Sequence, residues 1–66
     1  MEPIADQIMQ FFSCDHLPPH LAEVSRPWRL LAEEVVASLP NNAERSVALR
    51  KLLEGKDAAV RSLLVK

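Results

Sequence analysis

Leu39-Pro40-Asn41-Asn42 is the stretch that decides the fold, because it separates two segments whose apolar residues recur at the helical period. Pro40 cannot continue the preceding helix, since proline lacks the amide hydrogen and clashes with the turn before it. Asn41, with Glu44 three residues later, matches a capping box and predicts that a new helix begins here. So short a connection makes the two helices antiparallel neighbours. The sequence therefore predicts an α-helical hairpin.

Each helix of the hairpin has one apolar face. The helix before the turn begins at Pro19 or at Ser25, and Ser25 is favoured because serine caps helices well. Pro27 does not decide between them, because proline is accepted in a first turn and kinks a helix interior. The residues expected on the buried face of this helix are Trp28, Leu31, Ala32, Val35 and Leu39. For the helix after the turn, expected over residues 43–64, they are Leu49, Leu52, Leu53, Ala59, Val60, Leu63 and Leu64.

A third, shorter helix is expected at the N-terminus, over residues 2–12. Pro3 suits a first helical turn, and the apolar residues share one stripe: Ile4, Ile8, Phe11 and Phe12. The prolines at positions 18 and 19 then predict a fixed linker, because the residue before a proline is biased away from the helical region. The fold class is therefore all-α, with one domain over residues 1–66 made of an arm (1–19) and a hairpin (20–66).

Length and composition predict that this hairpin self-associates. A chain of 66 residues buries a small core, and its single cysteine, Cys14, excludes an internal disulfide framework. Two amphipathic helices and a short arm leave apolar surface uncovered, so we expect a homo-oligomer. The formal net charge of -1 argues against a DNA or RNA polymer as partner, because such binding depends on many cations. No membrane span or signal peptide is apparent, and a reducing cytoplasm is expected.

Lys56 is unusual because it falls on the apolar seam of the last helix. It follows Leu52 by four residues and precedes Ala59 by three. One interpretation is that its stem covers apolar surface while the ammonium reaches water. The other is that cations from several subunits converge on an anion, with Arg45, three turns earlier, at the opposite end of the same row.

On the outer face of the last helix, charged residues have the i,i+4 spacing of helix-surface ion pairs. These predicted pairs are Arg50 with Glu54 and Asp57 with Arg61. Such pairs give much of the charge on this helix a structural explanation.

Cys14, His16 and His20 have a spacing that superficially resembles a metal site. Zinc needs a fourth ligand and a suitable geometry, and the intervening Pro18-Pro19 is incompatible with a helical i,i+4 pair. A structured linker is the favoured interpretation, with no metal and no cofactor. The serine, cysteine and histidine residues form no nucleophile–base motif, so no catalytic residue is expected and the protein is predicted not to be an enzyme.

Aromatic and cationic residues flank this linker. Phe11 and Phe12 precede it, and Arg26, Trp28 and Arg29 follow it. One interpretation is that the aromatic residues pack in the core and the arginines are solvated. This interpretation applies above all to Trp28. An alternative for the others is nucleotide binding, because phenylalanine rings and guanidinium planes stack on bases and arginine also binds phosphate.

The end of the arm and the hairpin together carry a pattern of residues and spacings: His16-Leu17-Pro18, Ala32, Pro40, Glu44-Arg45, Ala48-Leu49-Arg50-Lys51-Leu52, Glu54, Lys56-Asp57-Ala58-Ala59 and Arg61. Over residues 11–64 this pattern resembles the helical hairpin domain of phage-encoded anti-CBASS cyclic-nucleotide sponges. The related anti-Thoeris sponge contains a similar hairpin. The resemblance is one of helices and spacings.

What the resemblance implies is a homohexamer in the host bacterial cytoplasm that sequesters cyclic oligonucleotide messengers without cleaving them. Such a sponge blocks CBASS-type immune signalling. A cyclic dinucleotide would lie between two protomers, stacked on Phe11 or Phe12 and contacted by Arg26. Tyrosine is more usual at the aromatic position in that family, so phenylalanine retains stacking and loses one hydrogen bond. Cyclic trinucleotides would lie at threefold positions, against cations placed at Arg45, Lys56 or Arg61.

The alternative function is a small protein–protein interaction module of a phage accessory protein. In that case the exposed apolar stripe binds another protein.

Overall fold

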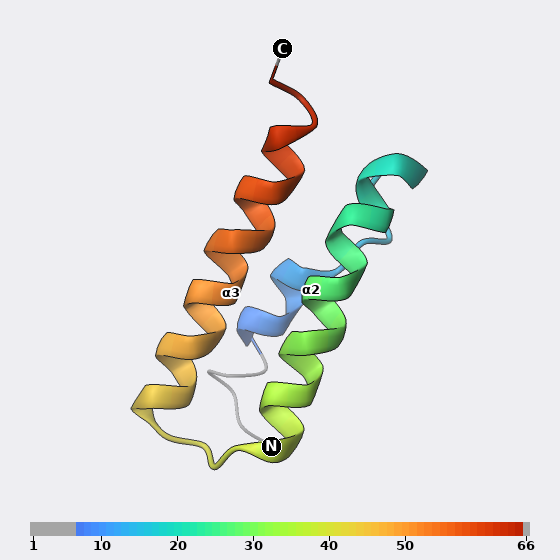
Figure 1. Ribbon diagram of the computed structural model, residues 1–66. Helices are drawn as coiled ribbons and strands as arrows, with labels where there is room; N and C mark the ends of the chain where they lie inside the picture. Colours follow the sequence, from blue (N-terminus) through green and yellow to red (C-terminus); the bar gives the residue numbers. More distant parts are fainter. Residues whose placement is uncertain (1–6, 66) are drawn as a thin grey trace.

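The chain forms a pair of long antiparallel helices with a short turn packed across them (Figure 1). The computed structural model describes residues 7–65, and within these residues the only regular structure is helical. The 3₁₀ turn η1 (Gln10–Phe12) precedes α2 (Pro19–Ser38) and α3 (Ala43–Ser62). Both long helices contact each other and η1. The predicted all-helical fold with a long helix pair is therefore confirmed.

The N-terminal arm departs from the expected helix over residues 2–12. Residues 2–6 of that helix lie outside the described residues. Residues 7–9 are α-helical and tighten into η1, which ends at Phe12. This turn places Phe12 fully inside, at 0% exposure, whereas Phe11 is 56% exposed. The predicted shared stripe is therefore wrong for Phe11, because the arm ends in a 3₁₀ turn.

α2 begins at Pro19, so the prediction that favoured Ser25 is wrong. The carbonyl oxygen of Pro18 accepts hydrogen bonds from the amides of Leu21 at 3.0 Å and Ala22 at 2.9 Å, which closes the first turn. Proline fits at the first helical position, because an amide there has no partner within the helix. Pro27 consequently lies inside α2, on its exposed side, where water can reach the carbonyl that proline leaves without a donor.

The connection between the long helices is residues 39–42, as the sequence predicts. Asn42 is the N-cap of α3, and its side-chain oxygen accepts a hydrogen bond from the amide of Arg45 at 2.9 Å. The predicted capping box from Asn41 to Glu44 is therefore wrong by one residue. Glu44 still lies in the first turn, where a negative charge is favourable beside the amide end of the helix.

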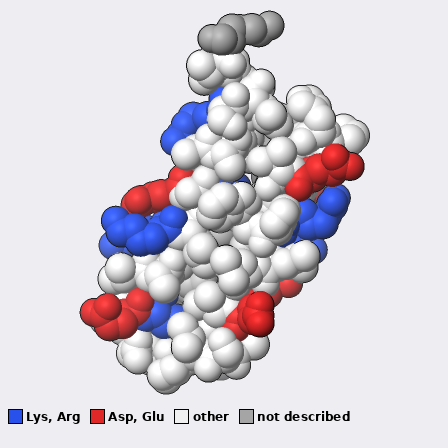
Figure 2. All heavy atoms as spheres, viewed as in Figure 1, with Lys and Arg blue, Asp and Glu red and all other residues white. Residues whose placement is uncertain are grey.

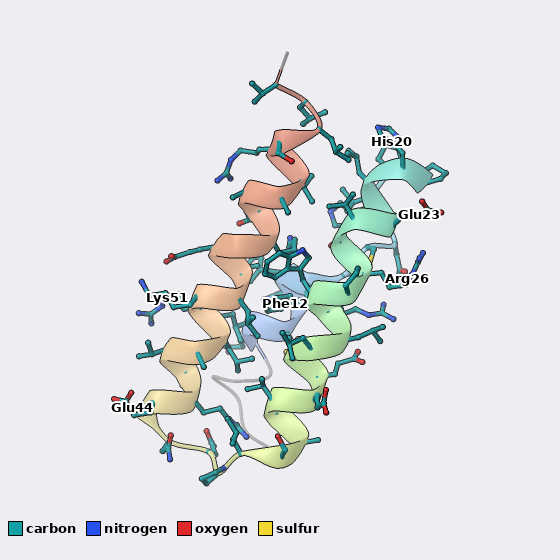
Figure 3. All side chains as sticks on the ribbon, in the orientation of Figure 1. Phe12, His20, Glu23, Arg26, Glu44 and Lys51 are labelled. Carbon is teal, nitrogen blue, oxygen red and sulfur yellow. The ribbon has the colours of Figure 1, made fainter. Side chains whose placement is uncertain are left out.

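The core lies where the three elements meet. Phe12, Ala32 and Leu49 are fully buried, one from each element, and a partly buried shell surrounds them: Ile8, Met9, Trp28, Val35, Val36, Leu52 and Leu53. Figure 3 shows Phe12 between the two long helices. One face of each helix is therefore buried against the other two elements.

Four residues predicted to be buried are exposed: Leu31, Leu39, Leu63 and Leu64. The last two directly follow α3, whose C-terminal end extends beyond the start of α2 (Figure 1). Leu39 follows the last residue of α2. A helix pair covers a narrow stripe of each partner, and these side chains fall outside it.

Candidate functional site

The two phenylalanines proposed for base stacking lie in different environments. Phe12 belongs to the core, so its ring faces are covered by protein. Phe11, its neighbour, presents more than half of its surface to solvent. Within this protomer Phe11 is therefore the aromatic side chain available to a ligand, and Phe12 anchors the segment that carries it.

Arg26 and Arg61 are the exposed members of the predicted cation set. Arg26 projects from α2 on the side away from α3 (Figure 3). Arg61 lies in the last turn of α3, where a positive charge is favourable beside the free carbonyl groups. Among residues 7–65, neither guanidinium forms an ion pair or a side-chain hydrogen bond. Both can therefore reach an anion from solvent.

Arg45 is committed to the protein itself. It is only 6% exposed, and its Nη1 donates to the carbonyl oxygens of Val36 and Leu39, each at 3.1 Å. These carbonyls belong to the C-terminal end of α2, where oxygen atoms have no partner within the helix. Arg45 therefore ties the start of α3 to the end of α2. Its Nε is buried without a hydrogen-bond partner among the described residues.

Lys56 is also largely withdrawn from solvent, at 8% exposure. Its Nζ lies 3.0 Å from Oδ1 of the adjacent Asp57, which is half-buried. The ammonium is therefore already paired within the protomer. This environment agrees with a stem packed on apolar surface better than with a cation free to meet a ligand.

The ion pairs on α3 differ from those predicted. Oε1 of Glu54 lies 3.7 Å from Nζ of Lys51, which is three residues earlier, and Asp57 pairs with Lys56. The predicted pairs of Arg50 with Glu54 and Asp57 with Arg61 are not formed in this structure. Both i,i+3 and i,i+4 neighbours share a helix face, so spacing alone does not distinguish them.

The residues considered as metal ligands, Cys14, His16 and His20, also lie in different environments. Cys14 is buried, and its Sγ lies 3.9 Å from the carbonyl oxygen of Phe12. His16 and His20 are exposed. Within residues 7–65, no group of three or more histidine, cysteine, aspartate or glutamate side chains is arranged to hold a metal ion.

The remaining feature of the surface is apolar. Figure 2 shows charged side chains mainly along the edges of one face, with a largely uncharged strip between them. The large exposed apolar residues are Phe11, Leu30, Leu31, Leu39, Val47, Leu63, Leu64 and Val65. Leu30 and Val47 lie outside both of the apolar stripes that the sequence predicts. The signal for Leu30 is its position midway between Arg26 and Glu34.

The described part of the protomer forms no pocket, so Phe11, Arg26 and Arg61 do not enclose a ligand by themselves. No helix among the described residues combines the length and apolarity needed to cross a membrane. Comparison of the chain with protein-family models, curated proteins and solved structures found no match.

Proposed function

We propose that this protein is a homo-oligomeric sponge that binds cyclic di- or trinucleotides and holds them without cleavage. The observation that carries the proposal is the contrast between Phe11 and Phe12. The fully buried ring of Phe12 fixes the end of the arm, and the adjacent ring of Phe11 is 56% exposed to solvent. A base stacked on such a side chain contributes about 1–3 kcal/mol.

The exposed arginines support the same ligand class. A cyclic dinucleotide carries two phosphates related by near-twofold symmetry. A twofold pair of protomers offers two copies of Phe11 and two of Arg26, which matches that symmetry without a large basic patch. Arg61, from the end of α3, would supply cations to a trinucleotide on a threefold axis. The net charge of -1 is compatible with binding of this kind.

Oligomerisation is part of the proposal, because one protomer has no pocket among its described residues. Exposed apolar side chains on all three elements provide surface for further copies. A hexamer, which has twofold and threefold axes, would create both kinds of shared site. Following the resemblance in the sequence, we place the protein in the host bacterial cytoplasm, where it would deprive CBASS-type effectors of their messenger.

The proposal is tested by calorimetric titration of the full chain against a panel of cyclic di- and trinucleotides. We expect micromolar or tighter binding to at least one of them. Phe11→Ala should weaken it by about tenfold or more, and Phe11→Tyr should retain it, because the stacking face is kept. Arg50→Ala, an exposed change on the outer face of α3, is the matched control.

The bound nucleotide is then recovered by heat denaturation and identified by mass spectrometry. The sponge mechanism predicts the intact cyclic molecule. Linear hydrolysis products would overturn it, and so would an oligomer that binds none of the panel at micromolar concentration.

The second candidate is a helical module that binds another protein. It is favoured by the apolar residues that follow α3, because Leu63, Leu64 and Val65 are all at least half exposed. The same titration separates the candidates, because this module needs no cyclic nucleotide.

A further inference from the structure

The outer face of α2 carries a self-complementary row of three residues. Leu30 is 52% exposed, Arg26 lies four residues before it and Glu34 four residues after it. Residues at i, i+4 and i+8 follow one row along a helix, so these side chains share a face. All three are exposed. A large apolar side chain therefore lies between one cation and one anion.

Neither charge of this row has an ion-pair partner among residues 7–65 of its own protomer, although Arg29 and Glu33 of the same helix approach to 3.6 Å. At 1.5 Å per residue, Arg26 and Glu34 are about 12 Å apart along the axis. That separation is far beyond ion-pair distance, so an intrahelical contact between them is excluded.

We propose that a second copy of this chain packs its α2 antiparallel across the row, about a twofold axis at Leu30. Arg26 and Glu34 are equally far from Leu30 along the sequence. The axis therefore brings Arg26 of each protomer opposite Glu34 of its partner, and the two copies of Leu30 meet at the centre. This surface, the α2 row, deepens the proposed function and rests on its homo-oligomer.

Charge fixes the orientation of this contact. A parallel pair in register would place Arg26 against Arg26 and Glu34 against Glu34, and like charges facing each other are strongly unfavourable. The antiparallel pair replaces both repulsions with attractions. An apolar centre with a charged rim is also the usual composition of a protein interface.

We expect this contact to be a small interface of modest affinity. The protomer exposes 4612 Å². A weak specific interface buries roughly 600 Å² on each partner, which is about an eighth of this surface. α2 is about 30 Å long at 1.5 Å per residue, so its outer face is long enough to supply that area. We therefore expect a seam that forms at micromolar concentration within the assembly.

Pairing of Arg26 with Glu34 across the α2 row is compatible with a role for Arg26 in ligand binding. A guanidinium has five N–H donors, and a carboxylate engages two of them. Donors remain for a phosphate placed at the same twofold seam.

The test is sedimentation analysis of the full chain and of variants in the α2 row, with circular dichroism to verify the helical fold. Leu30→Glu should shift the assembly to a smaller species at micromolar concentration. Arg26→Glu and Glu34→Arg should each raise the dissociation constant by about tenfold, because each places like charges together. Combining the two reversals restores the opposite charges, and should return the constant to within about threefold of wild type. Leu30→Ala, which keeps helix propensity, is the second apolar variant if Leu30→Glu does not fold.

The matched control is the reversed pair Lys51→Glu with Glu54→Arg on the outer face of α3, which should leave the assembly unchanged. An oligomer that is insensitive to Leu30→Glu and to both single reversals would overturn the α2 row and leave the proposed function standing. A chain that is monomeric at high micromolar concentration would overturn both.

Discussion

The indole ring of Trp28 in α2 lies directly against the backbone of α3 at Gly55. A Cβ built at position 55 would be 2.8 Å from Cζ3 and 3.0 Å from Cη2 of the indole. The only glycine of the chain therefore lies where another residue would push the two long helices or the ring apart.

Gly55→Ala should therefore destabilise the protein by about 1 kcal/mol, although alanine is the better helix former by a similar amount. Urea unfolding measures the difference. In the background of Trp28→Leu, which removes the ring, the same change should be neutral or stabilising. A more stable Gly55→Ala single variant would show that the ring moves aside at no cost.

Arg45→Met should lower the free energy of unfolding by about 2 kcal/mol, because it keeps the aliphatic stem and removes the bonds to two carbonyl groups of α2. Arg50→Met on the exposed outer face should change stability by less than about 0.5 kcal/mol. Chemical denaturation of both variants checks the comparison. Equal effects would mean that the bonds of Arg45 contribute no more than an exposed arginine does.

Asn42→Ala should cost about 1 kcal/mol, because it removes the oxygen that accepts the amide of Arg45. Asn41→Ala should have little effect, since this neighbour is exposed and does not cap α3. Thermal unfolding of the two variants is the measurement. The reverse ranking would restore the capping box that the sequence predicts.

Phe12→Ala should cost about 3–5 kcal/mol and leave the chain largely unfolded, because a domain of this size has little stability to lose. Phe11→Ala should leave the far-ultraviolet circular dichroism and melting temperature of the protomer nearly unchanged. This difference makes Phe11 a clean probe of ligand binding. A large loss of helix in Phe11→Ala would place that ring in the fold instead.

The position of the turn was predictable from the sequence, and the details around it were not. Pro40 and the adjacent asparagines fix residues 39–42 as the connection. Both asparagines are good caps, however, so residue type alone does not show that Asn42 is the one that accepts the amide of Arg45. The preference for Ser25 over Pro19 as the start of α2 was also wrong. Pro19 and Pro27 both suit a first turn, and Pro27 is accepted inside the helix because it is exposed.

Candidate site residues were harder to place, because their roles depend on burial. Adjacent phenylalanines look equivalent in the sequence, and the 3₁₀ turn separates Phe12 in the core from Phe11 in solvent. Arg45 and Arg26 are likewise the same residue type in amphipathic helices. Tertiary contacts with the end of α2 commit the first to the fold and leave the second exposed.

The four-residue connection between α2 and α3 affects how fast the chain folds. Closing so short a loop costs little entropy, and helical proteins with mostly local contacts fold in about microseconds to milliseconds. Meeting a second copy is a slower, bimolecular step whose rate rises with protein concentration. If the chain assembles as proposed, each copy should therefore be folded first, and the expression level should set the fraction that is assembled.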